Sequence, residues 1–439
     1  MTVELAHPST EPLPSRSPTA PAHPRWWFAR TTPGRILTIG VILATLGILS
    51  AFATSTTIND RQHELTTVLN HTEPLSFAAG QLYTTLSVAD AAAATAFIAG
   101  SEPRAVRQRY EQAITEAAVA VTRASSGLTD EPLVELLGRI NAQLAVYTGL
   151  IETARTNNRM GNPVGSSYLS EASALMQQSI LPEAQRLYEQ TSARVDAETT
   201  ASTRIPAPVI VVLITTLAFG AFAHRWLAHR TRRRINVGLI AGGLAILVMS
   251  IWVGTALTIS TAGSRSAKNT AAESLKTVTN LAITAQQARA DETLSLIRRG
   301  DEDVRKRSYY QRVDTMHQQL TEYLARKDAI DKSDLADADQ LLMKWRAADE
   351  RINAYIAVGN YQAATQVALG TGEDDSTPAF DKLDEALSNG IRESRNQLRN
   401  DILSARRVLS GATVGGVVLS VGAALAVALG MWPRLSEYR

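Results

Sequence analysis

The chain has 439 residues, of which 45% are hydrophobic and 20% charged, and its 44 basic and 42 acidic side chains leave a formal net charge of +2. It contains no cysteine, which excludes disulfides, thiolate metal sites and cysteine nucleophiles. The small net charge argues against a protein that binds polyanions over its whole surface. The mean hydropathy of −0.06 is typical of a soluble protein, but that average conceals four strongly apolar blocks.

Residues 1–35 contain seven of the 16 prolines, and this composition predicts a disordered leader. Four apolar blocks without Asp, Glu, Lys, Arg or His follow at 36–54, 205–223, 235–260 and 408–432. Because about 20 helical residues cross a hydrocarbon core of about 30 Å, each block predicts a transmembrane helix. The sequence Ala51-Phe52-Ala53 also fits a signal-peptidase site, but the length of the first block favours an uncleaved anchor.

The distribution of arginine predicts how these helices are oriented. The leader carries four arginines against two acids, the loop 224–234 carries five against none, and the tail 433–439 carries two against one. By the positive-inside rule these three pieces are cytoplasmic, so both termini of this multi-pass cell-membrane protein are expected inside. The two long segments 55–204 and 261–407 are then expected outside the cytoplasm.

Both long segments predict helical domains. Apolar residues recur with 4-3 spacing, the period of helices that pack side by side, and no strand-like alternation appears. Turn-forming residues divide each segment into about four helices, and the first and last helices are expected to continue unbroken into a span. The predicted fold is an all-α membrane protein with four transmembrane helices and two tandem four-helix bundles. The spaced positions are Leu133, Leu137, Ile140, Leu144, Tyr147 and Ile151, and Leu341, Trp345, Ala348, Ile352 and Tyr355.

The two long segments also read as copies of each other. At a constant offset of 200 residues, identical residue types recur in the order Gly, Glu, Arg, Tyr, and the four spans repeat at about the same interval. This agreement predicts a tandem duplication of span, outer domain and span. The matched pairs are Gly100 and Gly300, Glu102 and Glu302, Arg107 and Arg307, and Tyr110 and Tyr310.

No motif of a nucleotide-binding loop, a hydrolase or a metalloprotease occurs, so no catalytic, metal or cofactor site is expected and the protein is predicted not to be an enzyme. Arginines near helix starts are the candidate contacts for an outer ligand or partner: Arg104, Arg107, Arg305 and Arg307, with Arg109 and Arg312 nearby. Their alternative role is ion pairing with neighbouring acids such as Glu102 and Glu111.

Two further features concern the membrane. The cytoplasmic arginines Arg230, Arg232, Arg233 and Arg234 are candidate contacts for anionic lipid or for an acidic partner. Gly238-x-x-x-Gly242 and Gly411-x-x-x-Gly415 permit close helix approach, although ordinary lipid-facing glycines would give the same pattern.

The length, the four spans, the two outer helical segments, the proline-rich leader and the arginine-rich loop resemble the actinobacterial GlnX family of membrane proteins. The resemblance implies a non-enzymatic transducer of extracytoplasmic aspartate, glutamate or glutamine availability. It implies two protein partners: an extracytoplasmic amino-acid-binding lipoprotein (GlnH) and a cytosolic serine/threonine kinase (PknG). No nucleic-acid partner is expected, and a homo-oligomer stays open. The resemblance rests on architecture and assigns no functional residue.

Two other classes of function fit the same features. In one, the outer bundles bind a small molecule themselves, as in chemoreceptors. In the other, the chain is a structural scaffold of the cell envelope.

Overall fold

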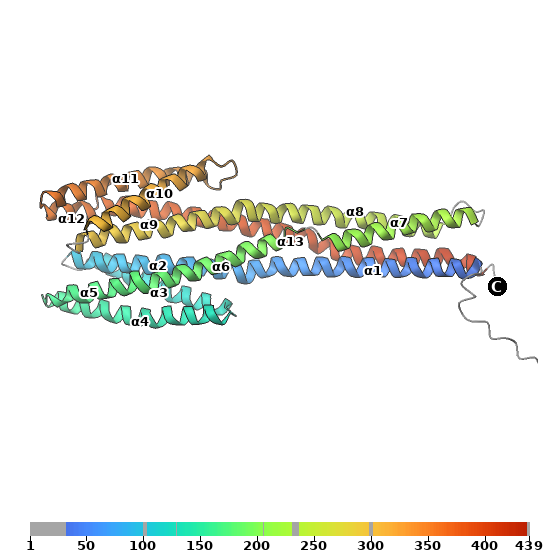
Figure 1. Cartoon of the computed structure of the whole chain (residues 1–439), viewed down its shortest axis with the longest axis horizontal. Coiled ribbons are helices and arrows are strands. Elements are labelled where there is room, and N and C mark those ends of the chain that lie inside the picture. Colours follow the sequence, from blue (N-terminus) through green and yellow to red (C-terminus); the bar gives the residue numbers. More distant parts are fainter. Residues whose placement is uncertain are drawn as a thin grey trace, which may run out of the picture. The chain divides into compact units, whose positions relative to one another are not determined.

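The structure, a computed structural model, describes residues 32–99, 103–128, 130–204, 206–230, 237–297 and 302–436. Within these ranges the regular structure is entirely helical, which confirms the predicted all-α class (Figure 1). Three junctions, α1–α2, α5–α6 and α8–α9, are π-helical turns at Val68–Thr72, Met176–Ile180 and Ala267–Ala272. The helices are α1 (Thr32–Thr67), α2 (Glu73–Ile98), α3 (Arg104–Gly127), α4 (Glu131–Arg159), α5 (Val164–Leu175), α6 (Leu181–Ala201), α7 (Ala207–Arg230), α8 (Val237–Ser266), α9 (Glu273–Ile297), α10 (Glu302–Ala325), α11 (Lys332–Ala357), α12 (Tyr361–Leu369) and α13 (Ser376–Ser436).

Four helical stretches are long and apolar enough to cross a membrane, judged by length and composition. They are Leu37–Ile98, Ala207–His229, Ile240–Leu296 and Ser376–Gly430, and each contains most of one predicted span. Large apolar side chains on these stretches are exposed, including Phe52, Val211, Ile251 and Val418. Such exposure suits side chains that face lipid. The orientation inferred from arginine stays a prediction.

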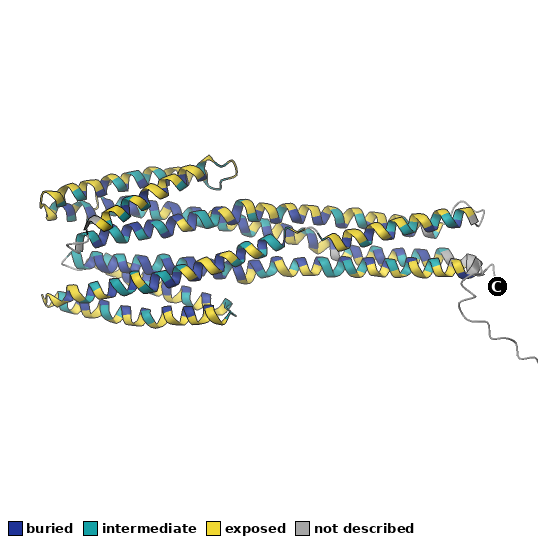
Figure 2. Ribbon diagram, in the orientation of Figure 1, coloured by how far each residue is buried: buried dark blue, intermediate teal, exposed yellow. Residues whose placement is uncertain are grey.

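The described chain divides into two compact units. The larger unit comprises residues 53–209 and 250–417 and holds, among its described residues, two large hydrophobic cores and a small cluster of Ile352, Ala364 and Ala368. The core of the first bundle is built from α2 to α6, and that of the second bundle from α9, α10, α11 and α13. Figure 2 shows the buried faces of these helices turned toward their neighbours within each bundle.

The apolar positions predicted from the 4-3 spacing are buried in the cores, except that the pattern on α11 is displaced by one residue at Leu341 and ends before Tyr355. All six predicted positions of α4 are buried, from Leu133 to Ile151. On α11 Trp345, Ala348 and Ile352 are buried as expected, but Leu342 replaces the half-buried Leu341 and Tyr355 is 38% exposed. Tyr355 lies in the last turn of α11, where the chain leaves the core to begin the additional short helix α12.

The turn between the third and fourth helices is the same in both bundles. Gly161 and Gly359 each have a positive φ, +72° and +75°, which glycine adopts without steric cost. Their spacing of 198 residues agrees with the predicted duplication. The second bundle then adds α12, which the sequence analysis missed, and Asn360 Oδ1 caps this helix by accepting a hydrogen bond from the Ala363 amide at 3.1 Å.

The junction between α6 and α7 contradicts the prediction of an unbroken helix. α6 ends at Ala201 and α7 begins at Ala207. Pro206 and Pro208 explain the break, because proline lacks a backbone donor and disfavours helix in the residue before it. The buried guanidinium of Arg61 donates hydrogen bonds to the carbonyls of Ser202 and Arg204, the latter at 3.2 Å. The other three predicted continuous connections are confirmed, two of them through a π-helical turn.

The smaller unit comprises the described parts of residues 1–52, 210–249 and 418–439. Ser50 and Thr216 share a buried hydrogen bond of 2.8 Å between α1 and α7. Gly238 and Gly242 lie directly against the backbone of α13, as the close-approach interpretation of this motif predicts. A Cβ atom at Gly242 would lie 2.7 Å from Val427 Cγ2 and 3.1 Å from the Ala423 carbonyl oxygen.

The second small-residue motif behaves differently, within the larger unit. Gly415 packs against the ring of Trp252, whereas Gly411 has no atom close to where its Cβ would stand. The close-approach interpretation therefore holds for one glycine of this motif and is wrong for Gly411, which lies on an open face of α13.

Candidate functional site

A cavity of about 450 Å³ lies between the two bundles, inside the larger unit. Its walls come from α2, α3 and α6 of the first bundle and from α9 and α13 of the second. Where α2 meets α9, a Cβ atom at Gly80 would lie 3.3 Å from Thr279 Cγ2 and 3.4 Å from Tyr188 Cδ2. The polar lining is Glu73, Ser76, Gln81, Thr84, Thr85, Arg109, Gln112, Glu116, Tyr188, Ser192, Asp196, Lys276, Thr279, Gln286, Asp384, Ser388 and Arg392.

The cavity carries acidic and basic groups at two positions along the helix axes, which we call the acidic level and the basic level. At one level, Asp384 of α13 accepts a hydrogen bond of 2.8 Å from Gln286 Nε2 of α9. Burial raises the pKa of Asp384, because desolvation disfavours a charged carboxylate. At the other level, Lys276 Nζ of α9 forms an ion pair of 3.1 Å with Asp196 of α6, and Arg392 of α13 lies on the same wall.

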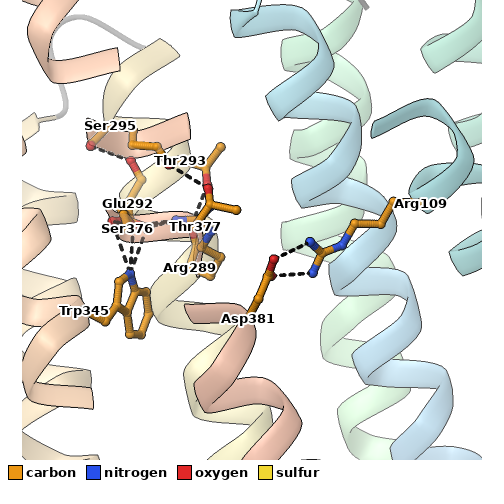
Figure 3. A network of polar contacts seen from close by, with 10 residues as sticks. Arg109, Arg289, Glu292, Thr293, Ser295, Trp345, Ser376, Thr377 and Asp381 are labelled. Atoms are coloured by element: carbon orange, nitrogen blue, oxygen red, sulfur yellow. Dashed lines mark hydrogen bonds and ion pairs between the residues drawn. The ribbon is translucent and has the colours of Figure 1, made fainter. Parts of the chain in front are cut away.

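Two groups of ion pairs flank the cavity and join the bundles. Arg109 of α3 forms a two-point ion pair with Asp381 of α13, as Figure 3 shows. Glu73 of α2, which is buried, forms ion pairs with Arg395 and with Arg399 of α13, the second at 2.8 Å. These charged contacts, together with the Lys276 pair, hold five helices of two bundles around one space.

The first bundle also contains a buried carboxyl group near its core. Asp90 of α2 accepts hydrogen bonds from Tyr147 Oη of α4 at 3.3 Å, from Ser173 Oγ of α5 at 3.1 Å and from Gln177 Nε2 at 2.8 Å. Burial raises the pKa of Asp90 to about 6. The three donors lower this value only in part, because they do not replace the solvation that the carboxylate loses.

The second bundle contains a matching network, drawn in Figure 3. Glu292 of α9 accepts hydrogen bonds from Trp345 Nε1 of α11, 3.2 Å from each oxygen, and from Ser376 Oγ of α13. Arg289 forms an ion pair with Glu292 and donates a hydrogen bond of 2.8 Å to Ser376. Burial and the nearby Glu292 carboxylate raise the pKa of Asp349 on α11.

The two networks are structural equivalents. In each bundle a carboxylate on the first helix accepts one hydrogen bond from an aromatic side chain on the third helix and one from a serine further along the chain, on α5 in the first bundle and at the start of α13 in the second. The sequence offsets of 198 to 203 residues support the predicted duplication. The corresponding pairs are Asp90 and Glu292, Tyr147 and Trp345, and Ser173 and Ser376.

The predicted outer arginines do not line the cavity. Arg104 is the exposed first residue of α3, and Arg107 forms an ion pair of 2.8 Å with Glu111 on the same helix. Arg305 is half-buried and Arg307 exposed, both on α10. A ligand or partner role for these four residues stays a prediction. Arg109, two residues beyond Arg107, is the arginine of this group that reaches the other bundle.

The predicted cytoplasmic arginines fall at the edge of what the structure describes. Arg230 is the last residue of α7, and Arg232, Arg233 and Arg234 lie outside the described residues. Among the described residues, no group of three His, Asp or Glu side chains is placed to hold a metal ion.

Comparison with known proteins gives one match. A family model described as "Actinobacterial sensor domain" matches residues 64–200, which run from the end of α1 to the end of α6. No curated protein and no solved structure matches the chain. The match supports a sensing role in an actinobacterial sensor protein. The first-bundle wall of the cavity and the Asp90 network both lie inside the matched residues.

Proposed function

We propose that the chain is a non-enzymatic transmembrane signal transducer of the GlnX type. In this proposal it relays the extracytoplasmic availability of aspartate, glutamate or glutamine to a cytosolic serine/threonine kinase. An amino-acid-binding lipoprotein delivers the signal to the outer bundles. The sensor-domain match and the four apolar helices support the membrane and sensing parts of this proposal.

The observation that carries the proposal is the interface between the two bundles. Direct packing of α2 on α9 is flanked here by charged contacts and a cavity, so apolar packing does not fill the interface completely. Interfaces of this kind have alternative arrangements that differ by small helix shifts. Asp381 and Arg399, which make two of the contacts, lie on α13, the 61-residue helix that also contains the fourth apolar segment. A shift at the interface therefore moves a helix that enters the membrane.

In this proposal a separate cytosolic protein reads the signal. A kinase that binds the arginine-rich loop 224–234 or the leader 1–35 would receive it. Clustered arginines suit an acidic docking surface on such a partner as well as anionic lipid.

The test is made in cells that lack the chain and carry either the wild type or a variant. Phosphorylation of the kinase substrates is measured before and after addition of aspartate, glutamate or glutamine. The wild type is expected to restore the response, whereas Asp381→Arg, which places two arginines opposite each other at the interface, is expected to weaken it. Glu111→Arg creates a like-charge pair within α3 alone and serves as the matched control. An amino-acid response that persists without the chain contradicts the proposal.

The second candidate is a direct receptor, and the cavity favours it. A volume of about 450 Å³ lies within the range of about 300–1,000 Å³ that is usual for small-molecule sites. Calorimetric titration of the full-length protein with the three amino acids separates the two functions. Saturable binding without a lipoprotein favours the receptor.

A further inference from the structure

The charges of the cavity are separated along its length. Asp384 lies beside Gln286, and Lys276 is ten residues before Gln286 on α9, which corresponds to about 15 Å of helix. On the facing helix α13, Asp384 and Arg392 are eight residues apart, or about 12 Å. The two helices thus give similar separations between the acidic level and the basic level.

The two levels differ in net charge. At the basic level, the cations Lys276 and Arg392 line the cavity together with the carboxylates of Glu73 and Asp196. Glu73 also forms ion pairs with Arg395 and Arg399, which do not line the cavity and make the total charge of this level positive. At the acidic level, the Arg109–Asp381 pair is neutral, and the additional carboxylates of Asp384 and Glu116 make the wall negative. A potential difference therefore runs along the cavity and favours a molecule with opposite charges at its two ends.

The distance between the acidic and basic levels distinguishes a free amino acid from a short peptide as the ligand. The ammonium and carboxylate of a free α-amino acid are attached to one carbon atom, so they cannot reach both levels. An extended peptide covers about 3.3–3.6 Å per residue, and about three or four residues span the 12–15 Å between the levels. We infer that the cavity binds an extended zwitterionic peptide of about three or four residues, with its amino terminus beside Asp384 and its carboxylate at Lys276 and Arg392.

The middle of the cavity suits a peptide chain. Gln81 and Ser388 supply amide and hydroxyl groups that can bond to peptide N–H and C=O groups. Ala282 and Ile391, which lie between the acidic and basic residues along α9 and α13, supply apolar surface for small side chains. A mostly uncharged centre between two charged ends matches the order of groups along a short peptide.

The charged residues retain capacity for a ligand. The ammonium of Lys276 has three N–H donors, and it donates a hydrogen bond to Asp196. The guanidinium of Arg392 has five N–H donors, and it donates a hydrogen bond to Asn389. Burial raises the pKa of Asp384, and an ammonium group beside it favours the ionised form and so forms a charge-assisted hydrogen bond.

The test uses the full-length protein in detergent micelles and isothermal titration calorimetry. The probes are tri-L-alanine and tetra-L-alanine, their N-acetylated and C-amidated forms, and free L-alanine and L-glutamate. At least one unmodified peptide is expected to bind saturably. Because each modification removes one charged contact, it is expected to weaken binding about tenfold or more. Free amino acids are expected to bind at least about tenfold more weakly than the peptide, since they reach one level only.

Variants assign the two ends. Asp384→Asn is expected to weaken the unmodified peptide but not the N-acetylated form, and Lys276→Gln to weaken it but not the C-amidated form. A merely structural role would change the affinity of all forms alike. Glu385→Gln and Lys344→Gln, at exposed positions of α13 and α11, are the matched controls and should leave binding unchanged.

The inference is overturned if no unmodified peptide binds the wild type, if acetylation and amidation have no effect, or if free amino acids bind as tightly as peptides. These results need no variant, so a poorly folded variant does not obscure them. The inference does not depend on the proposed partners. Loss of peptide binding together with an intact amino-acid response in cells would remove the inference and leave the proposed function in place.

Discussion

Arg109 of α3 and Asp381 of α13 face each other across the two bundles, with Nη1–Oδ2 at 3.1 Å and Nη2–Oδ1 at 2.8 Å. The two residues are 272 positions apart, and both side chains are more than 40% exposed. An exposed ion pair is worth about 0–1 kcal/mol. The pair therefore links the two bundles but contributes little to the stability of either.

Variants of this pair test whether Arg109 and Asp381 are in contact and how much the contact contributes to the free energy of unfolding. Asp381→Asn is expected to change the free energy of unfolding by at most about 1 kcal/mol, since solvent screens the pair. Asp381→Arg is expected to cost more, and the double variant Arg109→Asp/Asp381→Arg to recover most of that loss. Thermal melting of the full-length protein in detergent measures these differences. The Arg107–Glu111 pair within α3 is the control, and a double variant no better than Asp381→Arg would contradict the expected contact.

An engineered disulfide tests the packing of α2 on α9. The natural chain has no cysteine, so Gly80→Cys/Thr279→Cys introduces one defined pair. A Cβ atom at position 80 would lie 3.3 Å from Thr279 Cγ2. Because Thr279 Cβ is one bond from Cγ2, the two Cβ atoms lie within about 5 Å, close to the Cβ–Cβ distance of about 3.5–4.5 Å in disulfides. Oxidation is expected to link the two cysteines, and mass spectrometry of the digested protein detects the linked peptides.

The control for this disulfide is Gly149→Cys/Thr279→Cys, because position 149 on α4 has no atom within 4 Å of its Cβ. That pair is expected to stay reduced. Thiols at 80 and 279 that remain open to maleimide after oxidation would show that α2 and α9 do not pack as described.

Asp90 gives the first bundle a pH-dependent stability. Its pKa is raised from 3.8 to about 6 in the fold. The folded state therefore holds a proton that the unfolded state releases as the pH rises above 3.8, so stability is greatest below that pH and declines until about pH 6. The full decline corresponds to about 3 kcal/mol at 1.36 kcal/mol per pKa unit. Asp90→Asn is expected to remove this decline, because its amide takes up no proton in this pH range. The amide oxygen can accept from Tyr147, while the Ser173 hydroxyl and the Gln177 amide can turn to accept from the amide NH₂ group.

The measurement compares melting temperatures of wild type and Asp90→Asn from pH 4 to pH 7.5. The difference between them is expected to move in favour of the variant as the pH rises. Glu135→Gln, at an exposed position of α4, is the control and should run parallel to the wild type. Parallel curves for Asp90→Asn and wild type would contradict a buried, proton-binding carboxylate.

Two neighbouring glycines of α8, in the smaller unit, test the close approach of α8 and α13. Gly242→Leu is expected to destabilise the protein by about 1–3 kcal/mol, because its side chain meets Val427 and the backbone of α13. Gly243→Leu is expected to be nearly neutral, since no atom lies within 4 Å of its Cβ position. Thermal melting in detergent compares the two. Equal losses would mean that the close approach of α8 and α13 is not specific to one face.

Much of the fold follows from local patterns in the sequence. Helix period, turn residues and charge-free blocks predict the all-α class, the four apolar helices and the buried face of α4, because each signal acts over a few neighbouring residues. The break at Pro206 was missed for a physical reason. Proline is tolerated in a first helical turn, and whether the preceding helix joins that turn depends on contacts such as those of Arg61.

The candidate site was harder to predict than the fold. Lys276 and Asp384 lie on amphipathic helices whose charged residues look like an ordinary solvated face. Their importance comes from the pairing of two bundles, which no local pattern encodes. Arg109 belonged to a predicted arginine cluster, but its partner Asp381 was not predictable from spacing. The equivalence of Asp90 and Glu292 was likewise hidden, since the two residues differ in type and their offset departs from 200.

Because α6 and α7 are separate helices, the two halves of the chain differ in how an outer helix joins an apolar helix. α13 is a continuous helix of 61 residues that contains both Asp381 and the fourth apolar segment. α6, in contrast, ends at Ala201 and α7 begins at Ala207, and the Arg61 side chain donates hydrogen bonds to the Ser202 and Arg204 carbonyls. A displacement of α6 is therefore expected to reach α7 less directly than a displacement near Asp381 reaches the apolar end of α13.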